Sequence, residues 1–207
     1  MRHNSFFAPQ LMIDASNDYL IMSNTQLQDG ELSLRAVAPC DIEAIRRWRN
    51  SQMDVLRQTA FISTEAQRCY FEEYVWPEKG SRYPRQILLA IDLGGRLIGY
   101  GGLVHIAWQH KRAELSFLLE PSLENKSAVR ASLFLRFLRL VRILAFADLK
   151  LSRLWTETYA HRTEHISTLE ASGFQLEGCL REHVIIDGKP LDSLLHGLSL
   201  NKWKKMK

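Results

Sequence analysis

The sequence predicts an α/β protein whose mixed central sheet is covered by helices on both faces. Near the C-terminus, Gly173 follows a helical segment at the position where a left-handed residue commonly ends a helix. The dipeptide Asp187-Gly188 then indicates a two-residue β-hairpin turn, which needs positive φ angles. Upstream, the continuous apolar run at residues 87–91 is typical of a strand buried on both faces of a sheet. Strands of this kind alternating with helices favour an α/β fold.

The remaining elements are predicted from the spacing of apolar residues, which alternate in strands and recur on one face in helices. Strands are expected at residues 31–37, 85–92, 96–106, 111–119, 152–159, 175–186 and 191–198, and helices at residues 42–48, 65–75, 127–147 and 161–171. The helix that begins at Glu65 is expected to end before Pro77. Gly99, Gly101 and Gly102 indicate a bulge or a close approach between neighbouring backbones.

Length and composition indicate one globular domain of ordinary type. The chain has 207 residues, of which 46% are hydrophobic and 24% charged. The net charge of +4 suits an anionic ligand, although many proteins without such a ligand have a similar charge. No basic arm concentrates this charge, so no nucleic-acid partner is predicted. The lysines within residues 202–207 are interpreted as a solvated tail.

Cysteine content and the longest apolar stretches predict a cytoplasmic location. Cys40, Cys69 and Cys179 are odd in number and lack metal-binding spacing, which favours a reducing compartment and no metal site. The apolar stretch at residues 128–149 is interrupted by arginines, so no membrane span is predicted. Residues 1–30 are weakly patterned and are interpreted as an N-terminal extension of a domain at residues 31–207. The assembly is left open between a monomer and a homodimer.

The C-terminal region also contains a longer string with specific spacing, GF-x-x-EG-x-x-RE-x-x-x-x-DG-x-x-x-D. Its residues are Gly173, Phe174, Glu177, Gly178, Arg181, Glu182, Asp187, Gly188 and Asp192. This string resembles the C-terminal half of the GNAT superfamily of N-acetyltransferases. It is most similar to the branch with ribosomal-protein N-terminal acetyltransferases and nucleotide-sugar N-acetyltransferases. The resemblance extends over about residues 32–200 and implies the GNAT fold, with a splay between strands 4 and 5, and acetyl-CoA as co-substrate.

The resemblance also implies where CoA binds, with pantetheine along the fourth strand and the diphosphate at the start of the next helix. The implied cofactor-binding residues are Ser116, Phe117, Leu118, Leu119, Asn125, Lys126, Ser127, Arg130 and Arg162. The loop at residues 124–130 departs from the family pattern, because it has no glycine and Glu124 replaces a basic residue. Lys126 and Arg130 are expected to supply the phosphate-binding charge instead. The departure leaves weaker, altered or absent CoA binding open.

Three residues are candidates for the proton transfers of acetyl transfer to an amine. Glu114 is the candidate base, with a partner for Lys111 or Arg112 on a polar sheet face as the alternative. Leu169 stands where the family has a tyrosine that protonates the thiolate, so Tyr159 and His165 are the remaining candidate acids. The ordinary imidazole pKa of His165 suits proton transfer, and a surface histidine is the alternative.

The acceptor site is predicted from the string RRWRN at residues 46–50, which resembles a W-R-N string before the acceptor loop in the same branch. The candidate substrate-binding residues are Trp48, Arg49, Asn50, His105 and Trp108. A plain helix end capped by Asn50 is the alternative. The resemblance favours a nucleotide-linked amino sugar used for surface polysaccharide. Protein N-terminal acetylation of the ribosomal type and a non-catalytic GNAT-fold module are the alternatives.

Overall fold

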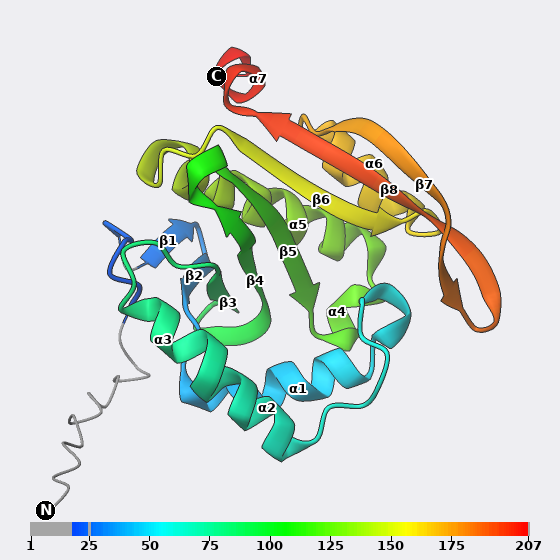
Figure 1. Ribbon diagram of the computed structural model, residues 1–207, viewed down its shortest axis with the longest axis horizontal. Helices are drawn as coiled ribbons and strands as arrows, with labels where there is room; N and C mark the ends of the chain where they lie inside the picture. The colour runs from blue at the N-terminus through cyan, green and yellow to red at the C-terminus, as the bar shows by residue number, and fades with distance from the viewer. Residues whose placement is uncertain (1–17, 25, 207) are drawn as a thin grey trace, which may run out of the picture.

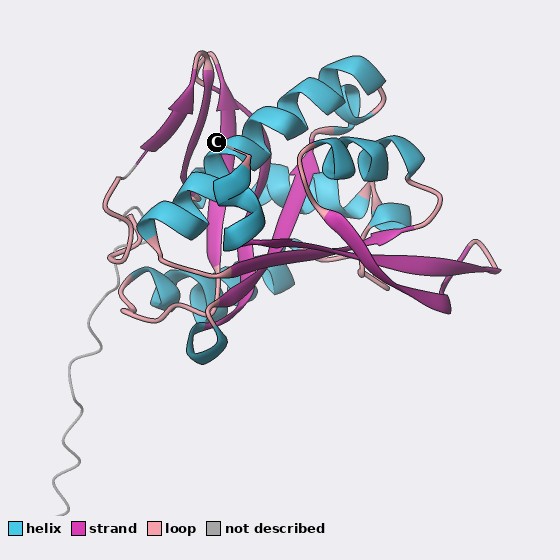
Figure 2. Cartoon of the chain, turned by 90° about the horizontal axis from the view of Figure 1, so that it is seen from above, coloured by secondary structure: helices cyan, strands magenta, loops and turns pink. Residues whose placement is uncertain are grey.

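The computed structural model describes residues 18–24 and 26–206 and shows one mixed sheet with the strand order β1-β2-β3-β4-β5-β6-β8-β7 (Figure 1). The strands are β1 (Gln26–Asp29), β2 (Leu32–Ala36), β3 (Ile87–Leu93), β4 (Arg96–Ala107), β5 (Arg112–Leu119), β6 (Arg153–Tyr159), β7 (Gln175–Ile186) and β8 (Lys189–Ser199). Neighbours pair antiparallel except β5 and β6, which are parallel. In Figure 2 the turn of the β7–β8 hairpin projects away from the helices.

Helices lie on both faces of the sheet, so the predicted fold class is confirmed. They are α1 (Ile42–Asn50), α2 (Thr64–Tyr70), α3 (Trp76–Lys79), α4 (Pro121–Glu124), α5 (Ser127–Arg142), α6 (Thr163–Ala171) and α7 (Leu200–Lys205). One core cluster joins the sheet to α5, and a second joins it to α1, to the π-helical turn at Phe71–Val75 and to α3. Strand β5 contributes to both clusters, because Ala113 and Leu115 face the first and Leu118 faces the second. No helix of the described residues is long and apolar enough to cross a membrane.

Glycines in β4 hold this strand close to its neighbours, as the sequence predicted. A Cβ atom on Gly101 would lie 2.4 Å from the carbonyl oxygen of Ser116 in β5. At Gly102, φ is +130° and a Cβ would lie 2.1 Å from the carbonyl oxygen of Ile87 in β3. Side chains at these positions would push the strands apart, so the glycines fix the position of β5.

The second predicted helix continues past Pro77, so the expected end before this proline is wrong. Phe71–Val75 forms a π-helical turn (η3) between α2 and α3, in which the N–H of Trp76 donates to the carbonyl of Phe71. Helix α3 then begins with Pro77 in its first turn, where a missing N–H leaves no intrahelical bond unmade.

The N-terminal segment contributes to the core where the structure describes it. Tyr19 is 1% exposed, and its hydroxyl accepts a 2.9 Å hydrogen bond from the N–H of Leu88. Met22 is also buried, whereas Leu20 is exposed. The short strand β1 was missed because four residues carry little periodicity. Residues 1–17 lie outside the described residues, and the domain boundary at residue 30 stays a prediction.

Two short elements near predicted loops were also missed. Residues 121–124 form the single turn of α4 in the expected loop at residues 121–126. The described lysines of the expected solvated tail are exposed, but the segment is helical, and α7 places Trp203 against Phe146 with 5.2 Å between the ring centroids. The lysines flank this buried anchor, which the composition of the segment concealed.

Candidate active site

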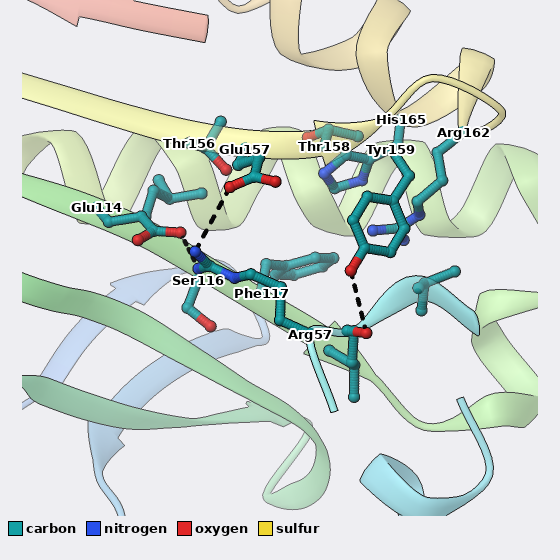
Figure 3. Close-up of a pocket in the computed structure, with 13 residues that line it drawn as sticks. Arg57, Glu114, Ser116, Phe117, Thr156, Glu157, Thr158, Tyr159, Arg162 and His165 are labelled. Carbon is teal, nitrogen blue, oxygen red and sulfur yellow. Dashed lines mark hydrogen bonds and ion pairs between the residues drawn. The ribbon is translucent and has the colours of Figure 1, made fainter. Parts of the chain in front are cut away.

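Strands β5 and β6 separate and open a cavity between them. Their parallel ladder pairs Arg112, Ala113 and Glu114 with residues 153–155 and extends no further among the described residues. The space beyond, here called the splay cavity, has a volume of about 90 Å³ (Figure 3). Its lining includes Arg57, Glu114, Ser116, Phe117, Glu157, Tyr159, Arg162 and His165. The predicted splay between the fourth and fifth expected strands is therefore present.

At one end of the splay cavity, Glu114 is 2% exposed and contacts an arginine and a histidine. The guanidinium of Arg57 contacts Oε1 of Glu114, and Nδ1 of His105 lies 2.6 Å from Oε2. Arg57 also lies 3.6 Å from Oε2 of Glu157 on β6, so it bridges carboxylates of two strands (Figure 3). The alternative pairing of Glu114 with Lys111 or Arg112 is not observed.

His105 reaches Glu114 from a bulge in β4. The register between β4 and β5 shifts between Val104 and Ala107, and His105 has a φ angle of +48°. A non-glycine residue with this angle is sterically costly and is commonly found where function constrains the backbone. The bulge thus places His105 beside the buried carboxylate.

Tyr159 lies on β6 with its side chain in the splay cavity. It is 6% exposed, and its hydroxyl donates a 3.3 Å hydrogen bond to the carbonyl of Leu56. Burial raises the pKa of Tyr159, Glu157 raises it further, and Arg57 opposes the shift. The hydroxyl therefore keeps its proton at neutral pH, which suits a proton donor.

His165 is buried, which corrects the expectation of an ordinary pKa. Its ring stacks on Phe134 with 4.1 Å between centroids, and its Nδ1 has no hydrogen-bond partner among the described residues. Burial lowers the pKa of His165 well below the usual value, and the nearby charge of Arg162 lowers it further. The neutral ring is a poor acid, so Tyr159 is the better candidate for protonating a thiolate.

At the other end of the splay cavity, a carboxylate lies between two arginines. Oε1 of Glu124 lies 2.8 Å from Nη2 of Arg162 and 3.2 Å from Nη1 of Arg130. Arg130 also contacts Glu164 at 2.6 Å. The side chains of Glu124, Arg130 and Arg162 are only 11–13% exposed. Burial lowers the pKa of Arg162, and Glu124 opposes this shift.

The start of α5 beside this network is open. Asn125, Lys126 and Ser127 are exposed, and no side chain caps the helix. Of the four predicted residues on β5, Ser116 and Phe117 line the splay cavity. Leu118 and Leu119 instead lie in the two core clusters.

A second, larger space of about 660 Å³, here called the outer groove, lies beside the splay cavity and shares Leu56, Arg57 and Ser116 with it. Its other lining residues include Arg49, Tyr70, Tyr74, Glu78, Arg85 and His105. Of the predicted substrate-binding residues, Arg49 and His105 therefore lie in this groove. Arg49 donates a 2.7 Å hydrogen bond to the hydroxyl of Tyr100.

The other three predicted substrate-binding residues lie outside the lining of the outer groove. Trp48 packs on the second core cluster, and Trp108 donates to the carbonyl of Pro84 at 2.8 Å. Asn50 forms hydrogen bonds of 2.9 Å with both the N–H and the carbonyl of Ile62, so it anchors the loop after α1. These residues support the site without facing the groove.

Sequence reasoning missed Arg57, Glu157 and the groove side of α2. Tyr70 and Tyr74 are 42% and 49% exposed and stack on each other with 5.7 Å between centroids. Their spacing is also that of the apolar side of a helix, so it did not mark a binding surface. Arg57 lies between helices in a loop without periodicity, so no pattern marked it.

The comparisons with known proteins agree with this geometry. Residues 34–195 match the family model described as Acetyltransferase (GNAT) domain. The structure of spermidine N-acetyltransferase from Vibrio cholerae with CoA and spermine is similar, with a TM-score of 0.73, 21% identity and coverage of 85% of this chain and 99% of that chain. A dodecameric structure of the spermidine N-acetyltransferase from Vibrio cholerae has a TM-score of 0.69, 20% identity and coverage of 86% and 99%. No curated protein matches the sequence significantly.

Proposed function

We propose that the acceptor of this enzyme is the amino group of a nucleotide-linked sugar. The chain belongs to the GNAT acetyltransferase family and is an acetyl-CoA-dependent N-acetyltransferase. Such amino sugars are building blocks of surface polysaccharide. The observation that carries the proposal is the outer groove, which combines a stacked tyrosine pair with an excess of positive charge.

The residues of the splay cavity fit a CoA thioester. Beyond Glu114, β5 has an edge without a ladder partner on the β6 side among the described residues, and such an edge can pair with the amides of pantetheine. The buried Nδ1 of His165 lacks a partner there. Arg130, Arg162 and the uncapped start of α5 offer positive charge and N–H groups to a diphosphate. Bound acetyl-CoA supplies the activated acetyl group.

The charges of the outer groove favour an anionic acceptor. Arg49, Arg57 and Arg85 line it. Arg85 pairs with Glu78 at 2.7 Å and Arg57 with Glu114 and Glu157, whereas Arg49 has no carboxylate partner among the described residues. This balance is unfavourable for spermidine, a polycation, which the Vibrio cholerae enzymes of similar fold acetylate. It is favourable for the phosphates of a nucleotide-linked sugar.

The tyrosine pair supplies a surface for a flat ring. Tyr70 and Tyr74 line the outer groove as a partly exposed stacked pair, on which a nucleobase can stack. Arg57 and Ser116 lie in both spaces, so an amine at the inner end of the groove is next to Glu114. Glu114 then accepts the ammonium proton through water, and Tyr159 retains a proton for the leaving thiolate.

The test is an assay of CoA thiol release with four acceptors at equal concentration. These are a nucleotide-linked amino sugar, the same amino sugar without its nucleotide, spermidine, and a peptide with a free N-terminus. The expected result is a kcat/KM for the nucleotide-linked sugar at least tenfold above that for the free sugar, because the nucleotide adds binding contacts. A preference for spermidine or for the peptide contradicts the proposal.

A further inference from the structure

The proposed function uses the two arginines of the ion-pair network beside α5 but gives no role to their carboxylate partner, Glu124. Glu124 accepts from both Arg130 and Arg162, and all three side chains are largely buried. Buried charges persist in proteins when they are paired, because an unpaired charge in a poorly hydrated site is strongly disfavoured. The Glu124 carboxylate therefore balances the charge of two guanidiniums, and Arg130 has Glu164 as a further partner.

The same guanidiniums are the positive groups best placed for the diphosphate of CoA. Arg162 lines the splay cavity, and Arg130 lies in the first turn of α5. A carboxylate that stays between them repels a diphosphate and occupies donors that the phosphate oxygens need. Binding of a diphosphate at full strength thus requires Glu124 to leave.

We propose that Glu124 is an internal counter-anion that the CoA diphosphate displaces from Arg130 and Arg162, and that this exchange sets the affinity for acetyl-CoA. The proposal rests on the donor half of the proposed function and is independent of the acceptor. Glu124 is a specificity-determining residue that acts through the two arginines. The exchange also accounts for an anion site in a loop without glycine. Arg130 and Arg162 supply the positive charge, and Glu124 balances it until the diphosphate binds.

The test compares binding of acetyl-CoA and S-acetylpantetheine by isothermal calorimetry, without any acceptor. S-acetylpantetheine has the thioester and the pantetheine arm but no diphosphate. The variant Glu124→Gln removes the negative charge and keeps the side-chain shape. It should bind acetyl-CoA about tenfold more tightly than the unmodified protein, equivalent to about 1.4 kcal/mol. Its affinity for S-acetylpantetheine should be unchanged.

The matched control is Glu120→Gln, which removes the same charge four residues earlier. Glu120 pairs with Arg96 at 2.9 Å and has no contact with Arg130 or Arg162 among the described residues. Its removal should change acetyl-CoA affinity by less than about twofold, because the charge of Glu120 is already countered by Arg96 and Glu120 does not occupy the donors of the two arginines. An equal gain in acetyl-CoA affinity by Glu120→Gln would show that the effect of Glu124→Gln comes from net charge alone, and it would overturn the proposal.

Three further results also overturn it. These are unchanged or weaker acetyl-CoA binding by Glu124→Gln, an equal change for S-acetylpantetheine, and a failure of every form to bind acetyl-CoA. If Glu124→Gln does not fold, Glu124→Asp retains the charge with a shorter reach. Glu124→Asp should then bind acetyl-CoA more tightly than the unmodified protein, by a smaller factor than expected for Glu124→Gln. An unchanged affinity of Glu124→Asp would contradict the proposal. An acceptor other than a nucleotide-linked sugar leaves all of these binding results unaltered.

Discussion

The two ends of the splay cavity carry ion clusters of opposite arrangement. At the acceptor end, the cation Arg57 contacts the buried carboxylate of Glu114. At the donor end, the carboxylate of Glu124 contacts the enclosed cations Arg130 and Arg162. In each cluster one side chain has the same charge sign as the ligand proposed there. Arg57 corresponds to the ammonium of the acceptor, and Glu124 corresponds to the diphosphate of CoA. The folded protein thereby satisfies its buried charges before a ligand arrives.

The two clusters differ in how open they are. The side chain of Arg57 is 50% exposed and comes from a loop, whereas the side chains of the donor cluster are 11–13% exposed. Water solvates the half-exposed Arg57 when it moves away, and the incoming ammonium replaces it as the partner of the buried Glu114. The comparison therefore indicates that acceptor binding needs a side-chain movement, whereas donor binding needs the exchange of an enclosed ion pair.

The largest expected effect tests the acceptor end. Glu114→Gln should lower kcat about a hundredfold with acetyl-CoA affinity unchanged, because the amide cannot accept the ammonium proton. Steady-state kinetics and calorimetry measure the two quantities. Glu43→Gln, in an exposed pair with Arg46, is the control and should retain full turnover. Full turnover by Glu114→Gln would mean that the acceptor end holds no base.

The donor end gives the next effect. Arg130→Ala should weaken acetyl-CoA binding about tenfold or more, because charge-assisted contacts to phosphate contribute roughly 1.5–3 kcal/mol each. Arg139→Ala is the matched control, since Arg139 lies further along α5 and contacts Asp29. Unchanged acetyl-CoA affinity of Arg130→Ala would mean that the phosphates bind elsewhere and that the donor cluster is not a phosphate site.

The sequence predicted the frame of the site better than its chemistry. The succession of strands and helices along the chain and the position of Glu114 on its strand follow from alternation and turn signals, which are local. The splay was implied by the family resemblance. The partners of Glu114 are distant in the sequence or depend on irregular backbone. Arg57 comes from a loop, and His105 lies in the bulge of β4 where the register with β5 shifts. The burial of His165 depends on Phe134, which α5 brings from a distant part of the chain. Tertiary packing therefore decides which side chains are charged, paired or exposed.

A smaller effect concerns His165, which lies between the two ends. Its folded-state pKa is depressed by burial, whereas in the unfolded chain it titrates near 6.5. The unfolded state therefore binds more protons below that pH, so this share of stability is complete above pH 6.5 and is lost as pH falls. The slope from one group is at most about 1.4 kcal/mol per pH unit.

Thermal melting between pH 5 and pH 8 measures this share. The variant His165→Leu should have a flatter pH dependence than the unmodified protein, because leucine has no proton to gain. Identical slopes for the two forms would show that His165 is accessible to protonation in the folded state. The proton-donor role would then return to it, and the alkaline limb of the pH–rate profile would report its titration.

The smallest expected effect concerns the rim of the acceptor end, where stacking rather than charge is proposed. Tyr74→Ala should raise KM for the nucleotide-linked sugar about threefold, because one aromatic contact contributes roughly 0.5–1.5 kcal/mol. The effect stays small because Tyr70 retains its own ring face. Turnover at saturation and acetyl-CoA affinity should not change, since Tyr74 does not line the splay cavity.

Tyr83→Ala is the control, because Tyr83 is also exposed but packs edge-on against Trp108 outside the groove lining. If both variants change KM equally, the outer groove does not bind the base. If Tyr74→Ala lowers kcat instead, the tyrosines order the loop that carries Arg57, and the openness of the acceptor end depends on them.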